Sequence, residues 1–105
     1  MSFRVGPAAR EDVAEIAEYM ELKTYGRGEQ FIDAVERAYT LIESMPRTQP
    51  PTEDGPPELE TRYHMIDGFR YRIVFAIHNE EIFVLAVAHV HQNPDRWRNR
   101  LTSEI

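Results

Sequence analysis

The sequence lacks several features that would assign it to a broad class of protein. It contains no cysteine, which excludes disulfides and thiolate metal clusters. No apolar run approaches the roughly 20 residues that a membrane-spanning helix needs. The first ten residues, MSFRVGPAAR, lack the apolar core of a secretory signal peptide. We therefore expect a cytoplasmic protein whose residues 1–105 form a single domain.

Positive charge is also scarce, and it is unevenly distributed. The net charge is −6, which argues against a general nucleic-acid coat. Residues 1–61 hold 6 Lys and Arg against 13 Asp and Glu, whereas residues 62–105 hold 6 Arg against 5 Asp and Glu. Arginine grips phosphate or carboxylate through paired hydrogen bonds. Two interpretations stay open: an acidic helical layer beside a neutral sheet, or a functional asymmetry.

Apolar spacing predicts two helices in the first half of the chain. A short strand at Phe3 to Val5 ends at Gly6-Pro7, and proline suits the entry to a helix. Apolar residues then recur at intervals of three and four over residues 13–20 and again over 31–45, which indicates one buried face on each helix. Pro46 ends the second helix and begins a loop that holds five of the seven prolines.

The second half changes to a period of two, which is typical of strands. We expect strands at about 61–66, 69–78 and 81–91, with turns at Asp67-Gly68 and Asn79-Glu80. A short helix follows from about residue 93. The order β-α-α-β-β-β(-α) predicts an α+β fold in which two helices pack on one face of a mostly antiparallel sheet.

The last hairpin predicts where the polar residues lie. If Asn79-Glu80 is a two-residue loop, Arg72 lies opposite Val87 and Arg70 lies opposite His89. An apolar face then packs under the helices, and His89 and His91 join both arginines on the outer face.

This arrangement favours some kinds of chemistry over others. A metal site would need a third ligand, and the neighbouring arginines repel cations, so we predict neither metal nor cofactor. Two arginines beside two histidines suit a phosphate ester, because arginine stabilises its charge and histidine moves a proton near neutral pH. The alternative is a solvated end of the sheet with hydrogen-bonded histidines.

Four segments, taken in order and spacing, resemble the RelE/ParE superfamily of bacterial type II toxins over nearly the whole chain. FRVGPAAREDVAEIAEYM is similar to the family's first strand and helix, and FIDAVERAYTLIESMP to its second helix. FRYRIVFAI resembles the central strand, which often reads Tyr-Arg-Ile-Val-Tyr. VLAVAHVHQNPDRWRNR resembles the closing pattern, commonly Ala-His-x-Arg-Arg-x-Pro-x-Tyr-Trp.

The resemblance implies a toxin encoded beside an antitoxin that wraps and silences it. RelE-like members cut messenger RNA on the ribosome without metal, and ParE-like members poison DNA gyrase without known hydrolytic chemistry. In the ribonuclease branch Arg72 would hold the scissile phosphate, His91 would be the general acid and Glu58 the general base. The resemblance also implies target or antitoxin contacts; the candidates, together with residues of the sheet's outer face, are Arg70, His89, Arg96, Trp97, Arg98, Arg100, Phe83 and Leu85.

Departures from the family pattern decide between the branches. The Arg-Arg pair is replaced by His91-Gln92, and Arg96 stands where the family has tyrosine before its tryptophan. An acidic chain would also be repelled by ribosomal phosphates. We therefore predict a ParE-like toxin that binds DNA gyrase, with a RelE-like ribonuclease as the alternative and an attenuated, non-toxic binding module as a second alternative. The sequence leaves the oligomeric state open, a homodimer included.

An apolar stripe on the outer sheet face needs a cover. It comprises Phe83, Leu85 and Val87, and is too large to leave exposed to water. Either an antitoxin segment covers it, or the chain's own C-terminal helix does so through Trp97 and Leu101.

Overall fold

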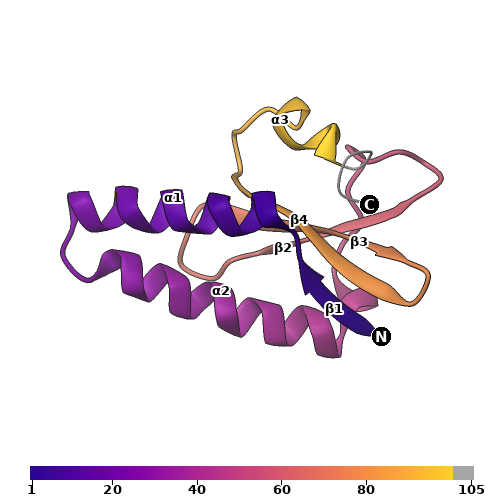
Figure 1. Ribbon diagram of the computed structural model, residues 1–105, viewed down its shortest axis with the longest axis horizontal. Coiled ribbons are helices and arrows are strands. Elements are labelled where there is room, and N and C mark those ends of the chain that lie inside the picture. The colour runs from indigo at the N-terminus through magenta and orange to yellow at the C-terminus, as the bar shows by residue number, and fades with distance from the viewer. Residues whose placement is uncertain (101–105) are drawn as a thin grey trace.

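Two long helices and a four-stranded sheet make up the computed structural model, which describes residues 1–100 (Figure 1). In chain order the elements are β1 (Ser2–Val5), α1 (Pro7–Lys23), α2 (Arg27–Ser44), the 3-10 turn η1 (Pro46–Thr48), β2 (Glu60–Met65), β3 (Tyr71–His78), β4 (Glu81–His89) and α3 (Asp95–Arg98). The predicted order of elements is confirmed. No helix within residues 1–100 is long and apolar enough to cross a bilayer.

The strands lie in the order β1-β4-β3-β2. The β2–β3 and β3–β4 pairs are antiparallel, and β1 runs parallel to β4. The sheet is therefore mostly antiparallel, as predicted. Its main core lies between one sheet face and the two helices, with Phe31, Val35 and Ile42 of α2 buried there.

The turn between α1 and α2 depends on two glycines and one carboxylate. Gly26 adopts a left-handed backbone, with φ of 83°, which a residue without Cβ adopts at little cost. The Glu21 carboxylate accepts hydrogen bonds from the backbone N–H groups of Gly26 (2.9 Å) and Gly28 (3.0 Å). A Cβ at Gly28 would lie 2.6 Å from the Ala17 carbonyl oxygen, so the close approach of the two helices requires glycine there.

A β-bulge in β4 overturns part of the predicted register. His78 to Phe75 pair with Glu81 to Val84 as expected, but Val74 then pairs with Ala86 instead of Leu85. The extra residue moves every later side chain of β4 to the opposite face. Arg72 consequently lies opposite Ala88, where Val87 was predicted. Val87 belongs to the core beneath the helices, while Leu85, Ala86 and Ala88 all lie on the outer face.

The bulge lies where β4 runs past the end of β1, so two of its backbone groups have no strand to pair with. Asp12 on α1 accepts a hydrogen bond from the Val87 N–H (3.0 Å), and Arg100 Nη1 donates to the Leu85 carbonyl (3.0 Å). Asp12 and Arg100 also pair with each other, with N···O distances of 2.8 and 3.2 Å. Side chains far apart in sequence thus satisfy backbone groups that would otherwise be buried unpaired. Arg100, a predicted contact for a partner, is engaged within the fold.

The turn at Asp67-Gly68 is also longer than predicted. The Ile66 N–H donates to the Tyr71 carbonyl, so residues 67–70 form the turn where two residues were expected. His64 lies opposite Ile73, where Tyr71 was predicted, but it keeps the same sheet face. Its Nδ1 lies 2.8 Å from Gln49 Oε1, and burial lowers the pKa of the imidazole.

Candidate functional site

The outer face of the sheet is covered by the chain's own C-terminal segment. Trp97 of α3 is 1% exposed and packs in a second apolar cluster that includes Phe83 and Leu85, both buried. We predicted that either an antitoxin segment or the chain's own tail covers the apolar stripe. In this structure the tail does so, and Trp97 is the side chain that packs there. Leu101 lies outside the described residues. Both side chains are therefore buried within the fold, and Phe83 also lies beneath Arg4, whose Cζ is 4.3 Å from the ring centroid.

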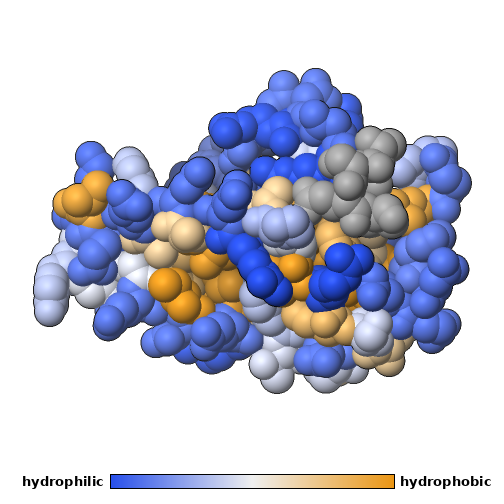
Figure 2. All heavy atoms as spheres, in the orientation of Figure 1, coloured by the Kyte–Doolittle hydropathy of each residue, from blue (hydrophilic) through white to orange (hydrophobic). Residues whose placement is uncertain are grey.

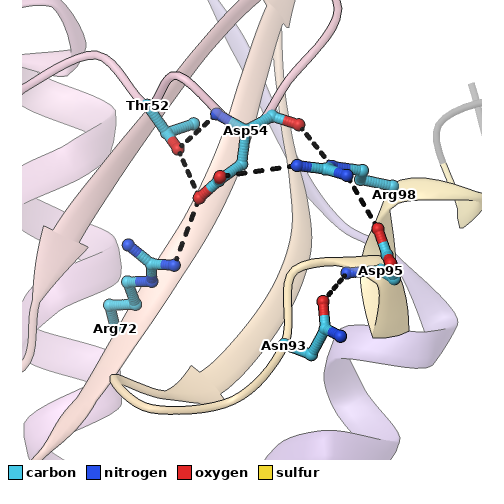
Figure 3. Close-up of polar contacts among 6 residues, drawn as sticks. All are labelled: Thr52, Asp54, Arg72, Asn93, Asp95 and Arg98. Atoms are coloured by element: carbon cyan, nitrogen blue, oxygen red, sulfur yellow. Dashed lines mark hydrogen bonds and ion pairs between the residues drawn. The ribbon is translucent and has the colours of Figure 1, made fainter.

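Arg72 lies beside this cover, on the outer face of β3, and its side chain is 17% exposed. Its Nη2 lies 3.5 Å from Asp54 Oδ2, and Arg98 Nη2 lies 3.5 Å from Asp54 Oδ1, so one carboxylate joins two guanidinium groups (Figure 3). Arg98 Nε also donates to the Asp54 carbonyl (2.8 Å), and its Nη1 pairs with Asp95 (2.7 Å). Asp54 therefore links the loop before β2 to both β3 and α3.

Local turn chemistry holds Asp54 in place. The Thr52 hydroxyl accepts a hydrogen bond from the Asp54 N–H (3.2 Å) and lies 3.3 Å from Asp54 Oδ2 (Figure 3). Arg72 also lies over the Tyr63 ring, with its Cζ 5.4 Å from the ring centroid. Arg72 Nε is buried without a hydrogen-bond partner among the described residues.

The two histidines lie apart from Arg72. His89 is opposite Tyr71, on the helix side of the sheet, and contacts it edge-on with centroids 5.2 Å apart. The predicted placement of His89 on the outer face with Arg72 is therefore wrong, because the bulge reverses the side-chain alternation beyond Leu85. His91 lies in the exposed turn after β4, which ends at His89 two residues earlier than expected.

The histidines interact with each other. The His91 backbone N–H donates to His89 Nδ1 (3.1 Å), which requires that this nitrogen carry no proton. Their ring centroids are 5.4 Å apart. Burial raises the pKa of the neighbouring Tyr71, so its phenol stays neutral at physiological pH. The two imidazoles and Tyr71 form a cluster of rings next to the helical layer.

The remaining predicted residues are dispersed. Glu58 is exposed in the loop before β2, and the carboxylate that reaches Arg72 belongs to Asp54, four residues earlier in the chain. Arg70 and Arg96 are exposed. The structure brings Arg72 and Arg98 together, but it does so through Asp54, which sequence reasoning did not identify. The available signal was weak: a threonine two residues before an aspartate in a proline-rich loop, which is a common turn pattern.

Two helices on one face of a mixed sheet, with a short C-terminal helix on the other, define the RelE/ParE class of small α+β toxin domain. The family model described as "ParE toxin of type II toxin-antitoxin system, parDE" matches residues 3–94. The chain belongs to this family and is a toxin component of a type II toxin–antitoxin system. Such a system implies a cognate antitoxin as partner.

A solved structure supports the fold. The chain is similar to a structure titled "Chromosomal ParDE TA system from P. aeruginosa", with a TM-score of 0.63 and 18% sequence identity. The alignment covers 85% of this chain and 95% of that chain. A comparison with curated proteins gave no match.

Proposed function

We propose that this toxin acts by binding DNA gyrase, without cutting a bond, and that a cognate antitoxin neutralises it. The observation that carries the proposal is the state of Arg72, the residue expected to hold a scissile phosphate. Its side chain is 17% exposed and its guanidinium is paired with Asp54. His89, which was predicted to lie beside Arg72 on the outer face, lies on the other sheet face. A binding function needs none of these groups to act together.

Membership of the ParE family is consistent with this proposal, and the acidic balance of the chain adds to it. A net charge of −6 opposes entry into the ribosome, where phosphate surrounds the messenger RNA. The same charge does not oppose contact with a protein that presents basic surfaces.

A supercoiling assay tests the proposal directly. Purified toxin is titrated into gyrase, relaxed plasmid and ATP, and we expect loss of supercoiling that the cognate antitoxin restores. Pulse-labelling after induced expression should show DNA synthesis falling before protein synthesis. Unchanged supercoiling at high molar excess of toxin would contradict the proposal. If expression arrested neither synthesis nor growth, the chain would be an attenuated binding module.

One observation favours the ribonuclease alternative. Arg72 and Arg98 converge on a single carboxylate, and a phosphate that displaced Asp54 would meet both guanidinium groups. On this reading Arg72→Ala and His91→Ala should each abolish ribosome-dependent cleavage of messenger RNA, with Glu58→Gln reducing it. Cleavage that survives both of the first two substitutions would remove this alternative.

A further inference from the structure

One carboxylate from the loop before β2 lies between two guanidinium groups on the outer side of the sheet. Asp54 Oδ2 lies 3.5 Å from Arg72 Nη2 of β3, and Asp54 Oδ1 lies 3.5 Å from Arg98 Nη2 of α3 (Figure 3). Each carboxylate oxygen therefore faces a different cation. The oxygens of a phosphate group accept from guanidinium donors in the same way. Asp54 thus occupies a position that also suits an external phosphate.

The ion pairs of the Asp54 carboxylate are long. Close charge-assisted contacts between nitrogen and oxygen measure about 2.7 to 2.9 Å, and the Arg98–Asp95 pair, at 2.7 Å, is of this kind. Both contacts of the Asp54 carboxylate are 3.5 Å. Its backbone is held more closely, because Arg98 Nε donates to the Asp54 carbonyl at 2.8 Å. The carboxylate is therefore the loosely held part of this residue.

The covered face also contains polar groups that lack partners. Arg72 Nε and Trp97 Nε1 are buried and have no hydrogen-bond partner within residues 1–100. Buried donors are normally paired, and an unpaired donor costs free energy. A largely buried guanidinium also requires a counterion, which Asp54 supplies. The cover over Arg72 therefore joins a necessary counterion to incomplete hydrogen bonding, a combination that favours a cover able to open.

Residues 53–58 form a strap beside the start of β2. The Thr52 N–H donates to the Thr61 carbonyl of β2 (3.0 Å) just before the strap begins. A Cβ added at Gly55 would overlap the Thr61 hydroxyl, so the strap lies close against this strand. Asp54 joins the strap to β3 and to α3. A movement of the strap away from β2 would therefore carry the carboxylate away from both guanidinium groups.

We propose that Asp54 is an autoinhibitory counterion, whose carboxylate keeps Arg72 and Arg98 from holding a phosphate group, and that displacement of the strap opens this site. Asp95 does not replace it, because the Asp95 carboxylate contacts Arg98 alone of these two arginines. Arg72 has no other counterion within residues 1–100. The opened site would therefore present an unpaired guanidinium beside a second one. It does not depend on whether gyrase is the target of the toxin.

Four variants separate the counterion from the overall charge of the chain. Asp54→Asn removes the charge and keeps the shape of the side chain. Gly55→Ala displaces the strap and leaves the charge unchanged. Asp95→Asn is the charge-matched control, because it removes one carboxylate beside Arg98 and leaves the contact of Arg72 in place. Asp54→Asn/Arg72→Gln tests whether any gain in binding requires the Arg72 guanidinium.

Two probes distinguish phosphate in a nucleic-acid strand from free phosphate. Fluorescence anisotropy gives the dissociation constant for a short, fluorescein-labelled single-stranded RNA at an ionic strength of about 0.1 M, where charges interact over only about 10 Å. Melting temperatures in sodium phosphate and in sodium chloride of equal ionic strength detect binding of inorganic phosphate. Circular dichroism confirms that each variant is folded.

We expect Asp54→Asn to lower the dissociation constant for RNA on the order of tenfold relative to the parent. Gly55→Ala should lower it about threefold, since the displaced strap keeps its charge, and Asp95→Asn should stay within about twofold of the parent. The double variant should return to the value of the parent. If inorganic phosphate raises the melting temperature of Asp54→Asn while RNA binding stays unchanged, the site takes free phosphate and the autoinhibitory role still holds.

Three results would overturn the proposal. Equal gains for Asp54→Asn and Asp95→Asn would mean that net charge alone controls binding. A gain that survives Arg72→Gln would place the phosphate site elsewhere. No gain with either probe would show that Asp54 masks no such site. Each of these results would leave gyrase binding to be decided separately by the supercoiling assay on the parent chain.

Discussion

Replacing Trp97 with alanine should destabilise the domain by about 3 to 5 kcal/mol, the usual cost of truncating a buried tryptophan. The side chain is 1% exposed and packs in the cluster of Phe83 and Leu85. Its Nε1 has no hydrogen-bond partner among the described residues, so the loss arises from apolar burial and the cavity left behind. Because α3 is only four residues long and Trp97 is its one buried side chain, we expect a value near 3 kcal/mol.

Urea unfolding followed by far-ultraviolet circular dichroism measures this change without relying on fluorescence, since Trp97 is the chain's single tryptophan. A loss of 3 kcal/mol corresponds to a melting temperature lower by roughly 12 °C or more in a domain of this size. Trp97→Phe is the matched control. It keeps an aromatic ring and removes the unpaired donor, so it should cost less than about 1.5 kcal/mol.

An unchanged urea midpoint and slope for Trp97→Ala would refute the reasoning. The tail would then contribute nothing to folding in solution, and the outer face of the sheet would be open to a partner. If Trp97→Ala lost antitoxin binding but kept its stability, the antitoxin would be the true cover of the stripe.

Substitutions at three further positions test the fold. Gly28→Ala should cost about 1 to 3 kcal/mol, read from thermal melting, because its Cβ would overlap the preceding helix. Asp12→Ala should cost about 2 kcal/mol, since it leaves the Val87 N–H without its acceptor and removes the carboxylate that pairs with Arg100. Asp12→Asn keeps an acceptor for that N–H and should cost less; equal values would contradict this. His64 binds a proton less readily in the folded state than in the unfolded state, so stability should fall as the pH drops below about 6.5, and His64→Gln should flatten that part of the profile of urea midpoint against pH.

The fold could be predicted because its signals are local and repeated. Apolar spacing identified both long helices, and alternation with Asn79-Glu80 identified the last hairpin, whose first four residue pairs match the expected register. The bulge could not be predicted in the same way. The segment VLAVAHV has no alternation of polar and apolar residues that would mark Leu85 as an extra residue. The groups that favour the bulge, Asp12 and Arg100, are far away in sequence.

The candidate site was harder to predict, because it too depends on contacts between residues that are far apart in sequence. Resemblance placed Arg72 on the central strand, and the structure confirms that location. Whether its charge is available depends on Asp54, which sits in a proline-rich loop that carries no periodic signal. Sequence reasoning chose Glu58 from that loop, but the contact to Arg72 is made by a residue whose position Thr52 helps to fix.

These contacts determine which of the arginines remain available to bind an anion. Arg72 and Arg98 are joined to Asp54, and Arg100 is joined to Asp12 at the bulge. The sequence suggested that the arginines of the second half bind an anion. Most of them instead form ion pairs or hydrogen bonds within the fold. The acidic charge of the chain is concentrated on α1 and α2, which together carry nine Asp and Glu against four Lys and Arg (Figure 2). This distribution supports the proposal of gyrase binding over RNA cleavage, because an acidic helical layer attracts a basic protein surface and repels a phosphate backbone.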